Sequence, residues 1–372
     1  MTLAKTASFE MEALSPCLQV STAAYQRPLT SPSLRFGTRF GVTMLALPVA
    51  PRLAERRQPT SQRLWVYTKD DLYETYSNRG YMQPDLTEPI LELVRLTSTS
   101  LPPDVEAALR RSLEQEAPGS AAHGALQTIL QNVELSRANS TPICQDTGTP
   151  LFYVHYPEGW GTRQLREQIE QAVAAATKRS FLRPNSVNAL TDKNTGNNLG
   201  DAHFPTIHFD EVGGDALIIE LMLKGGGCEN VGAQYSLPHA PTGAGRDLAG
   251  VRKVVLDAVH KAQGQGCAPG ILGVAIGGDR GSSYLASKEV LLRSLDEPNP
   301  DPRLAELEER LTAEANQLGI GPMGFGGKTT VVGTRITGMH RLPASYFVSV
   351  SYMCWAYRRR RLTWQNNQAS YA

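Results

Sequence analysis

The feature that most constrains this chain is a pair of apolar stretches, at 216–223 and 271–276, each about as long as a buried strand. Residues 248–263 lie between them and carry apolar side chains at helical spacing. Strands that alternate with helices along a chain are typical of an α/β domain. We therefore expect one large α/β domain with a mixed sheet and interleaved helices.

Shorter patterns predict the remaining elements of this domain. Apolar periodicity predicts further helices near 86–94, 105–113, 125–135, 164–178, 288–295 and 303–318. Alternating or short apolar runs predict strands near 203–210, 329–334 and 346–351. The protein-like pattern begins at Met82, and we place the domain at 82–357.

The two ends of the chain have a different composition. Residues 1–81 are rich in Ser, Thr, Pro and Arg over most of their length and show no sustained period, so we expect a disordered or non-native leader. A targeting leader fits the arginines, although Glu10 and Glu12 argue against it. We favour the alternative, in which this segment is not part of the working protein and Met82 is the true start. Residues 358–372 are expected to be a solvated basic and polar tail, with a partner contact as the alternative.

Overall composition excludes several classes of protein. The chain has 372 residues, 41% apolar and 20% charged, with a net charge of +1. This balance suits a globular protein and gives no reason to expect nucleic acid or an anionic membrane as a partner. No apolar run approaches the roughly 20 residues that a membrane-spanning helix needs.

Three of the five cysteines lie in segments that suggest a functional site. The cysteines are Cys17, Cys144, Cys228, Cys267 and Cys354, an odd and widely spaced set that does not indicate a disulfide framework. Cys144, Cys267 and Cys354 are flanked by Gln-Asp, by Gly and Pro, and by Trp. Soft thiolates favour iron–sulfur clusters, zinc or copper, but no CxxC pair is present to choose among them. A buried, apolar role for each cysteine stays open.

Two glycine-rich segments follow predicted strands. In Lys224–Asn230, the glycines at 225–227 could turn backbone N–H groups toward an anion, or could form only a tight turn. The segment 277–282 matches neither GxGxxG nor the P-loop pattern, so we expect no nucleotide site there.

Several separated motifs occur in a fixed order along the chain. They are Ile-Cys-Gln-Asp-Thr-Gly at 143–148, Leu-Arg at 182–183, Asn-Thr-Gly-Asn-Asn at 194–198, Lys-Gly-Gly-Gly-Cys-Glu-Asn at 224–230, Gly-Cys-Ala-Pro at 266–269, Ile-Gly-Gly at 276–278, Gly-Pro-Met-Gly-Phe-Gly-Gly-Lys at 321–328, and the segment 341–356. With this ordered set, residues 82–359 resemble the alpha, or N-terminal, part of the class I fumarases and the related tartrate dehydratases. The resemblance implies an iron-dependent hydro-lyase domain.

The resemblance also implies a cofactor and its ligands. In that family three cysteines hold a [4Fe–4S] cluster whose fourth iron stays open for substrate, and the matching positions are Cys144, Cys267 and Cys354. Cys228 falls where relatives carry serine or cysteine, so we expect it near the site but not as a ligand.

Further matches imply how a small dicarboxylate is bound. Arg183 matches a residue that grips a substrate carboxylate, and Arg341 is a second candidate. Gln145 and Asp146 match residues beside the substrate, with Asp146 as a candidate proton carrier, and Gly227 matches a glycine that faces it. Taken without the resemblance, the residues favour a turn or cap role for Asp146 and a surface ion pair for Arg183.

One position departs from the family pattern, and the substrate therefore stays open. Leu342 stands where relatives often have a substrate-contacting histidine. The leading hypothesis is the alpha subunit of a fumarate hydratase that interconverts fumarate and (S)-malate in the cytoplasm. Because the sequence ends soon after Cys354, we expect a separate beta subunit and a homo- or hetero-oligomer. The alternatives are an L-tartrate dehydratase alpha subunit or a non-catalytic metal-binding scaffold.

Overall fold

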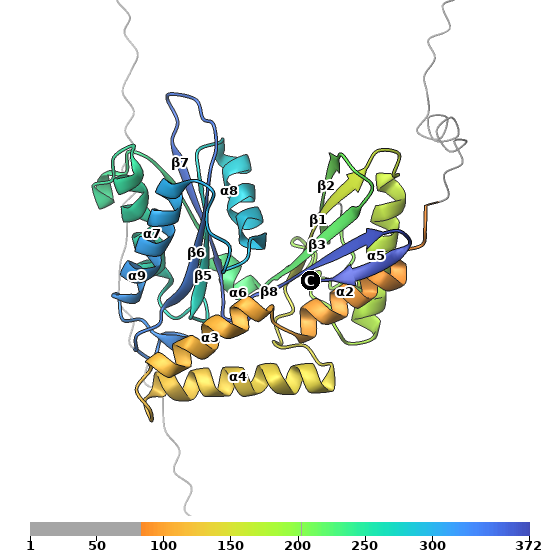
Figure 1. Cartoon of the computed structure of the whole chain (residues 1–372), viewed down its shortest axis with the longest axis horizontal. Coiled ribbons are helices and arrows are strands. Elements are labelled where there is room, and N and C mark those ends of the chain that lie inside the picture. Colours follow the sequence, from red (N-terminus) through yellow and green to blue (C-terminus); the bar gives the residue numbers. More distant parts are fainter. Residues whose placement is uncertain (1–82, 202) are drawn as a thin grey trace, which may run out of the picture. The chain divides into compact units, whose positions relative to one another are not determined.

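Two mixed β-sheets and the helices that pack on them make up the part of the chain that the computed structural model describes, residues 83–201 and 203–372 (Figure 1). The helices are α2 (Thr87–Thr99), α3 (Pro103–Gln115), α4 (Ala121–Asn139), α5 (Thr162–Lys178), α6 (Gly226–Asn230), α7 (Leu248–Ala262), α8 (Arg280–Glu289) and α9 (Pro302–Asn316). The strands are β1 (Thr149–Pro157), β2 (Thr206–Val212), β3 (Leu217–Lys224), β4 (Ala233–Ser236), β5 (Gly270–Ile276), β6 (Val331–Gly338), β7 (Phe347–Met353), β8 (Arg358–Gln365) and β9 (Gln368–Tyr371). The described residues all belong to one compact unit.

The five-stranded sheet has the order β2-β1-β3-β8-β9. β1 runs parallel to β2, and the other neighbours are antiparallel. Helices α2 and α5 pack against this sheet (Figure 1), because each places a stripe of apolar residues on one side. Leu93, Ile169 and Ile219 are fully buried in the resulting core.

The four-stranded sheet has the order β4-β7-β5-β6. β5 runs parallel to β6 and antiparallel to β7, which in turn is antiparallel to β4. Helices α7 and α9 lie on one side of this sheet and α8 on the other (Figure 1). Every residue of β5 is buried, which explains why this stretch of the sequence is apolar without alternation.

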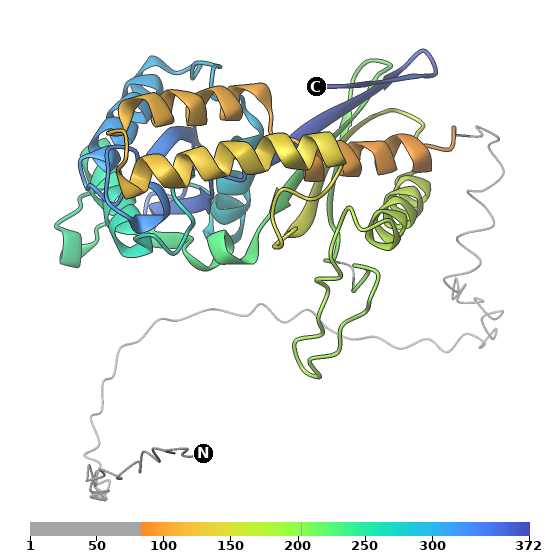
Figure 2. The ribbon, with the colours of Figure 1, turned by 90° about the horizontal axis from the view of Figure 1, so that it is seen from below.

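Helix α4 precedes the segment that carries Cys144. Its N-terminus is capped by the Ser120 hydroxyl, which accepts a hydrogen bond from His123 N at 3.1 Å. The helix runs alongside α3 and also contacts α2 (Figure 2). It ends at Ser140, which adopts left-handed backbone geometry, and the chain then enters the segment that contains Cys144.

The predicted fold class, a mixed α/β arrangement with interleaved helices, is confirmed, and most predicted elements occur near their expected positions. The helix expected at 288–295 is wrong, because α8 begins at Arg280 and gives way to a 3-10 turn at Val290–Leu292. Asp279 caps that helix by accepting hydrogen bonds from Gly281 N and Ser282 N, a role that sequence periodicity does not reveal. The patterns also missed β1 and β4.

The expectation that residues 358–372 form a solvated tail is wrong. This segment forms β8 and β9, and β8 pairs with β3 along its length. Arg358 is only 1% exposed and Arg359 pairs with the buried Asp104, so ion pairs and hydrogen bonds replace solvent around these charges. The leader expected at 1–81 lies outside the described residues, and the domain boundary at Met82 stays a prediction. Within residues 83–201 and 203–372, no helix combines the length and the apolar character needed to cross a bilayer.

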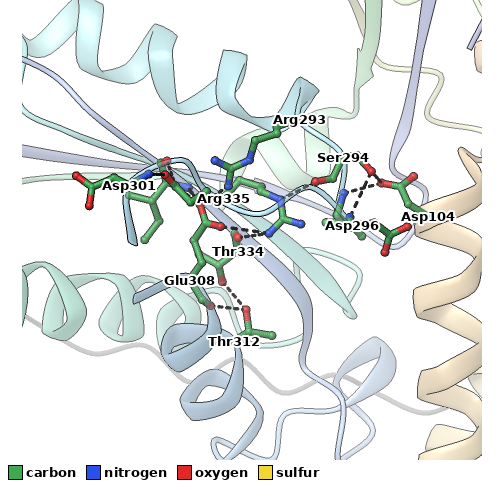
Figure 3. A network of polar contacts seen from close by, with 12 residues as sticks. Asp104, Arg293, Ser294, Asp296, Asp301, Glu308, Thr312, Thr334 and Arg335 are labelled. Carbon is green, nitrogen blue, oxygen red and sulfur yellow. Dashed lines mark hydrogen bonds and ion pairs between the residues drawn. The ribbon is translucent and has the colours of Figure 1, made fainter. Parts of the chain in front are cut away.

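A buried polar network joins α3 to the segment after α8 (Figure 3), and an ion pair extends it to β8. The Asp104 carboxylate accepts hydrogen bonds from Ser294 Oγ at 3.0 Å and Leu295 N at 2.7 Å, and it pairs with Arg359. Burial acts to raise the pKa of Asp104, but the Arg359 charge and these hydrogen bonds outweigh it and lower the pKa below 3.8.

We predict that Asp104→Asn destabilises the chain at pH 7 by about 3 kcal/mol, because it leaves the Arg359 charge buried without its partner. The folded-state pKa of Asp104 is depressed, so its stabilisation is fully present above the unfolded value of 3.8. As pH falls through the folded pKa, that stabilisation is lost and the difference between wild type and variant shrinks. Urea unfolding across this pH range measures the difference. The exposed neighbour Asp296 provides the control, since Asp296→Asn should change stability little at any pH. Equal effects of the two variants at pH 7 would contradict the prediction.

Candidate functional site

Cys267 and Cys354 lie at the same edge of the four-stranded sheet. Cys267 comes just before β5 and Cys354 just after β7, and the antiparallel register pairs Ile271 with Met353 at this edge. Trp355 N donates a hydrogen bond to the Cys267 carbonyl at 3.2 Å, which ties the two cysteine-bearing loops together directly. Both thiols are free and partly exposed.

Glycines beside Cys267 make room for an aromatic ring. A Cβ on Gly266 would lie 2.5 Å from the Tyr352 ring, and one on Gly270 would lie 2.2 Å from it. Cys267 itself has a positive φ of 54°, a left-handed geometry that is uncommon for a residue with a Cβ. The sequence Gly-Cys-Ala-Pro-Gly therefore wraps the Cys267 loop closely around the end of β7.

Cys144 reaches the same region from the loop between α4 and β1. Its neighbour Ile143 is held on both sides, because Ile143 N donates to the Ser98 carbonyl at 3.0 Å and Asn132 Nδ2 donates to the Ile143 carbonyl at 2.8 Å. The Cys144 thiol is free and partly exposed. Fixing the residue before it limits the positions that this thiol can take.

The loop that follows Cys144 lies directly on the glycine run after β3. A Cβ on Gly148 would lie 2.6 Å from the Lys224 backbone, and one on Gly225 would lie 2.9 Å from Asp146 Oδ2. The Asp146 carboxylate accepts hydrogen bonds from Gly148 N at 3.0 Å and from Gly227 N at 3.4 Å. A Cβ on Gly227 would meet no atom within 4 Å, so the backbone there borders open space.

Cys228 is the buried member of the group. It is 3% exposed in the short helix α6, with its thiol 3.2 Å from the Gly225 carbonyl. A hydrogen bond with Cys354 and the nearby Lys224 charge lower the pKa of Cys228 to about 6, despite its burial. The same hydrogen bond and burial raise the pKa of Cys354, so the two thiols titrate as a pair.

The pKa of the Cys267 thiol depends on the other acidic groups of this region. Burial raises the pKa of Cys267, and the proximity of Cys144, Cys228 and Asp146 raises it further. The structure thus brings Cys144, Cys267, Cys354, Cys228 and Asp146 together from segments far apart in the sequence.

Lys224 supplies a buried positive charge at this junction, and sequence reasoning missed it. Its side chain is 2% exposed, and its ammonium group donates to the Tyr352 carbonyl at 2.8 Å and pairs with Glu229 at 3.1 Å. Because Lys224 ends β3 and Tyr352 lies in β7, this hydrogen bond connects the two sheets. A lysine before a glycine run carries no signal that would reveal this burial.

Arg358 was missed for a different reason, since its run of four arginines is typical of a solvated segment. Arg358 Nη2 donates to the Asp146 carbonyl at 2.8 Å, so the start of β8 supports the Asp146 loop. Its charge also lowers the pKa of Cys354, against the larger effects that raise it.

Arg183 is placed beside this loop by a set of buried amides and hydroxyls. Arg183 N and Asn185 Nδ2 both donate to Thr147 Oγ1, at 3.1 and 2.9 Å. Asn198, 1% exposed, donates to the Arg183 carbonyl at 2.6 Å and accepts from Asn185 N at 2.6 Å. The exposed guanidinium of Arg183 then reaches the Gln145 carbonyl at 3.3 Å. The motif at 194–198, noted only as part of the resemblance, thus positions Arg183.

Arg341 is not brought together with the cysteines within one chain. It lies in the loop between β6 and β7, at the opposite end of β7 from Cys354, which is about 20 Å away at the usual rise per residue. Its guanidinium donates to the carbonyls of Leu342, Pro343 and Ser345, each at 3.1 Å, and packs 4.6 Å from the Tyr346 ring. Its role in substrate binding stays a prediction that this placement does not support. Leu342 lies in the same loop and is 74% exposed.

The three thiols come from separate loops, and their chemistry is that of cluster ligands. Among residues 83–201 and 203–372, no three His, Cys, Asp or Glu side chains are placed to bind one metal ion. Three partly exposed thiols that approach from separate loops can instead each bind a different iron of one cluster. The charges of Lys224 and Arg358 act in favour of ionised Cys228, and Arg358 acts in the same sense on Cys354, while burial and the neighbouring thiols raise the pKa of Cys354 and Cys267 overall. The residues present therefore fit an iron–sulfur cluster.

Comparison with known proteins gives the family. Residues 87–363 match the family model described as fumarate hydratase (Fumerase). A Geobacillus stearothermophilus protein assigned as a class I fumarate hydratase is 49% identical over 277 residues, which cover 74% of this chain and 54% of that protein. The L(+)-tartrate dehydratase subunit alpha of Escherichia coli strain K12 is 32% identical over 292 residues, or 77% of this chain and 93% of that subunit.

This chain belongs to the fumarate hydratase family. The resemblance inferred from the ordered motifs is thereby confirmed. The chain spans about half the length of the Geobacillus relative but nearly the full length of the tartrate dehydratase alpha subunit.

We predict that Asn198→Ala loosens the Arg183 segment. The change removes three buried hydrogen bonds and places alanine at a φ of 60°, with an expected loss of about 1–3 kcal/mol. Hydrogen exchange at Arg183 N and Asn185 N should speed up. Asn198→Gly tolerates the positive φ yet removes the same bonds, so it separates strain from lost bonding. The adjacent and exposed Asn197 provides a matched control, and exchange as fast in Asn197→Ala would contradict the positioning role of Asn198.

Proposed function

We propose that this chain is the cluster-binding, alpha-type part of a class I fumarate hydratase, which interconverts fumarate and (S)-malate. The observation that carries the proposal is the meeting of three free, partly exposed cysteines beside Asp146 and the backbone of Gly227. Family membership supports the reaction class, since a fumarate hydratase adds water across a double bond.

Cys144, Cys267 and Cys354 are the proposed ligands of a [4Fe–4S] cluster. When bound, such a cluster with one iron free of cysteine supplies a Lewis acid that polarises a substrate hydroxyl. Cys228 is 3% exposed and hydrogen-bonds within its own turn and with Cys354. We therefore assign it to the support of Cys354 and not to iron binding.

Arg183 is the proposed clamp for a substrate carboxylate. Among the described residues its guanidinium forms no ion pair, and its one hydrogen bond to the Gln145 carbonyl is long, at 3.3 Å. The remaining N–H groups can bind a carboxylate with the fork geometry that arginine offers. The open space at Gly227 leaves room for a small dicarboxylate, and the exposed Gln145 is a further candidate to contact it.

Asp146 is the proposed proton carrier. Its carboxylate lies between two backbone N–H groups, and Arg358 fixes its carbonyl, so the whole residue is held in place. A fixed carboxylate at the edge of the open space can take a proton from the substrate carbon in one direction and return it in the other. The backbone contacts orient the carboxylate for this exchange before substrate arrives.

A second subunit is part of the proposal. The relatives from E. coli and Methanocaldococcus jannaschii are named as alpha subunits, and they match this chain over 93% and 95% of their lengths. We infer that a beta chain completes the substrate site, within a hetero-oligomer located in the cytoplasm. The site described above supplies one carboxylate clamp, and a dicarboxylate needs a second.

L-tartrate dehydratase is the alternative activity. The tartrate dehydratase alpha subunits support it through their near-complete coverage, and Leu342 in place of the family histidine separates this chain from the usual pattern. The greater identity to the class I fumarate hydratase favours fumarate. A metal-binding scaffold without activity is the third candidate.

We predict that Cys144→Ser, Cys267→Ser and Cys354→Ser each lose the cluster when the full chain is purified without oxygen. Iron and sulfide analysis should give about four of each per wild-type chain and far less in these variants. Cys228→Ser is the matched control, because it makes the same change at a cysteine that is not a proposed ligand. This variant should retain most of the iron. Loss of iron in Cys228→Ser, or its retention in any of the other three, would overturn the ligand assignment.

We further predict that activity appears only when the loaded chain is combined with its beta partner. Turnover of fumarate and malate, but not of tartrate, is the expected result. Turnover of tartrate alone would establish the alternative activity. If the complex contains the full cluster and acts on none of these compounds, the chain is a metal-binding scaffold without activity.

A further inference from the structure

A cavity lined by arginines lies away from the cysteine site, where α2, α3, α4 and β8 approach one another. Its volume is about 750 Å³, which is within the usual range for pockets that bind small molecules. Its lining includes four arginines, Arg95, Arg110, Arg137 and Arg360, and one carboxylate, Glu106. None of the cysteines, Asp146 or Arg183 contributes to it.

Three of these arginines have acidic partners. Arg95 forms two hydrogen bonds with Glu92, at 2.6 and 2.7 Å. Arg110 pairs with Glu106 at 2.8 Å and Glu134 at 2.9 Å, and Arg137 also pairs with Glu106. Four guanidinium groups therefore face three carboxylates.

Arg360 is the arginine left over. Among residues 83–201 and 203–372 its guanidinium has neither a hydrogen-bond partner nor an ion-pair partner, and its Nε is shielded from solvent without an acceptor. Partial burial and the charges of Arg137 and Arg95 lower its pKa, and the Glu92 charge only partly offsets them. An unpaired guanidinium in such surroundings costs free energy that a bound anion would recover.

β8 explains why this side chain points into the cavity. Successive side chains of a strand alternate between its faces, so Arg358, Arg360 and Leu362 share one face. Leu362 packs into the core beneath α2, and Arg358 reaches Asp146. Arg360, between them, faces the ends of α2 and α4, while Arg359 and Arg361 turn to Asp104 and Glu220 on the other face.

We propose that this cavity binds a small organic or inorganic oxyanion, with the Arg360 guanidinium as its principal donor and Arg95 and Arg137 beside it. Carboxylate and phosphate oxygens share the geometry that an arginine fork recognises. The single positive charge left over fits an anion of low charge. This site is separate from the proposed catalytic site and does not depend on the proposed reaction. β8 nevertheless links the two, because Arg358 of the same strand holds the Asp146 loop.

Calorimetric titration of the full chain with inorganic phosphate and, separately, with succinate tests the proposal at constant chloride. We expect one site per chain for at least one of the two anions. Arg360→Gln should weaken binding by more than about tenfold, the loss expected for a charged hydrogen-bond donor. The neighbouring Arg361, which lies on the opposite face and pairs with Glu220, provides the matched control, and Arg361→Gln should bind as wild type does.

Thermal unfolding gives a second measurement that does not depend on the calorimetric signal. The bound anion should raise the melting temperature of wild type and of Arg361→Gln but not of Arg360→Gln. Without anion, Arg360→Gln should be at least as stable as wild type, because it removes an unpaired charge. Binding by phosphate alone or by succinate alone supports the proposal and identifies the headgroup. Failure of wild type to bind either anion at millimolar concentration, or equal loss in both variants, would overturn it.

Discussion

The hydrogen bond from the buried Lys224 ammonium to the Tyr352 carbonyl is the contact on which the site most depends. It connects the end of β3 in one sheet with β7 in the other, at the point where the cysteine loops meet. Burying an ammonium group is costly, and the carbonyl together with the Glu229 carboxylate offsets that cost. The same positive charge adds to the hydrogen bond from Cys354 in lowering the pKa of the Cys228 thiol, so one residue both joins the sheets and contributes to the electrostatics of the site.

Close backbone approach is the second requirement. The Asp146 loop can rest on the glycine run only because Gly148 and Gly225 lack side chains, since a Cβ at either position would collide with the opposite segment. Both interpretations of the glycine run therefore contain part of the answer. The run makes a tight turn into α6, and its Gly227 N–H faces an anion, namely the Asp146 carboxylate of the chain itself.

Most of the helices and the central strands were predictable from sequence because their apolar periodicity reflects which face is buried. The failures have a common cause. α8 begins at a polar capping box, and β8 carries four arginines, so a hydrophobic pattern predicts neither element. Arg359 and Arg361 are accommodated by Asp104 and Glu220, which lie more than a hundred residues earlier in the chain. No local pattern contains that information.

The cysteines, the acidic Asp146 and the glycines beside them could be recognised in the sequence, because the chemistry of thiols and the geometry of glycine are properties of the residues themselves. Their order along the chain was also enough to indicate the family. Only the tertiary structure decided that Cys267 lies near Cys144 and Cys228, and Cys354 near Cys228. It also decided that Arg341 lies at the far end of β7, and that Arg358 and Lys224 bring positive charge to the site. Strand register and the packing of two sheets determine these placements, and both depend on contacts between segments that are distant in sequence.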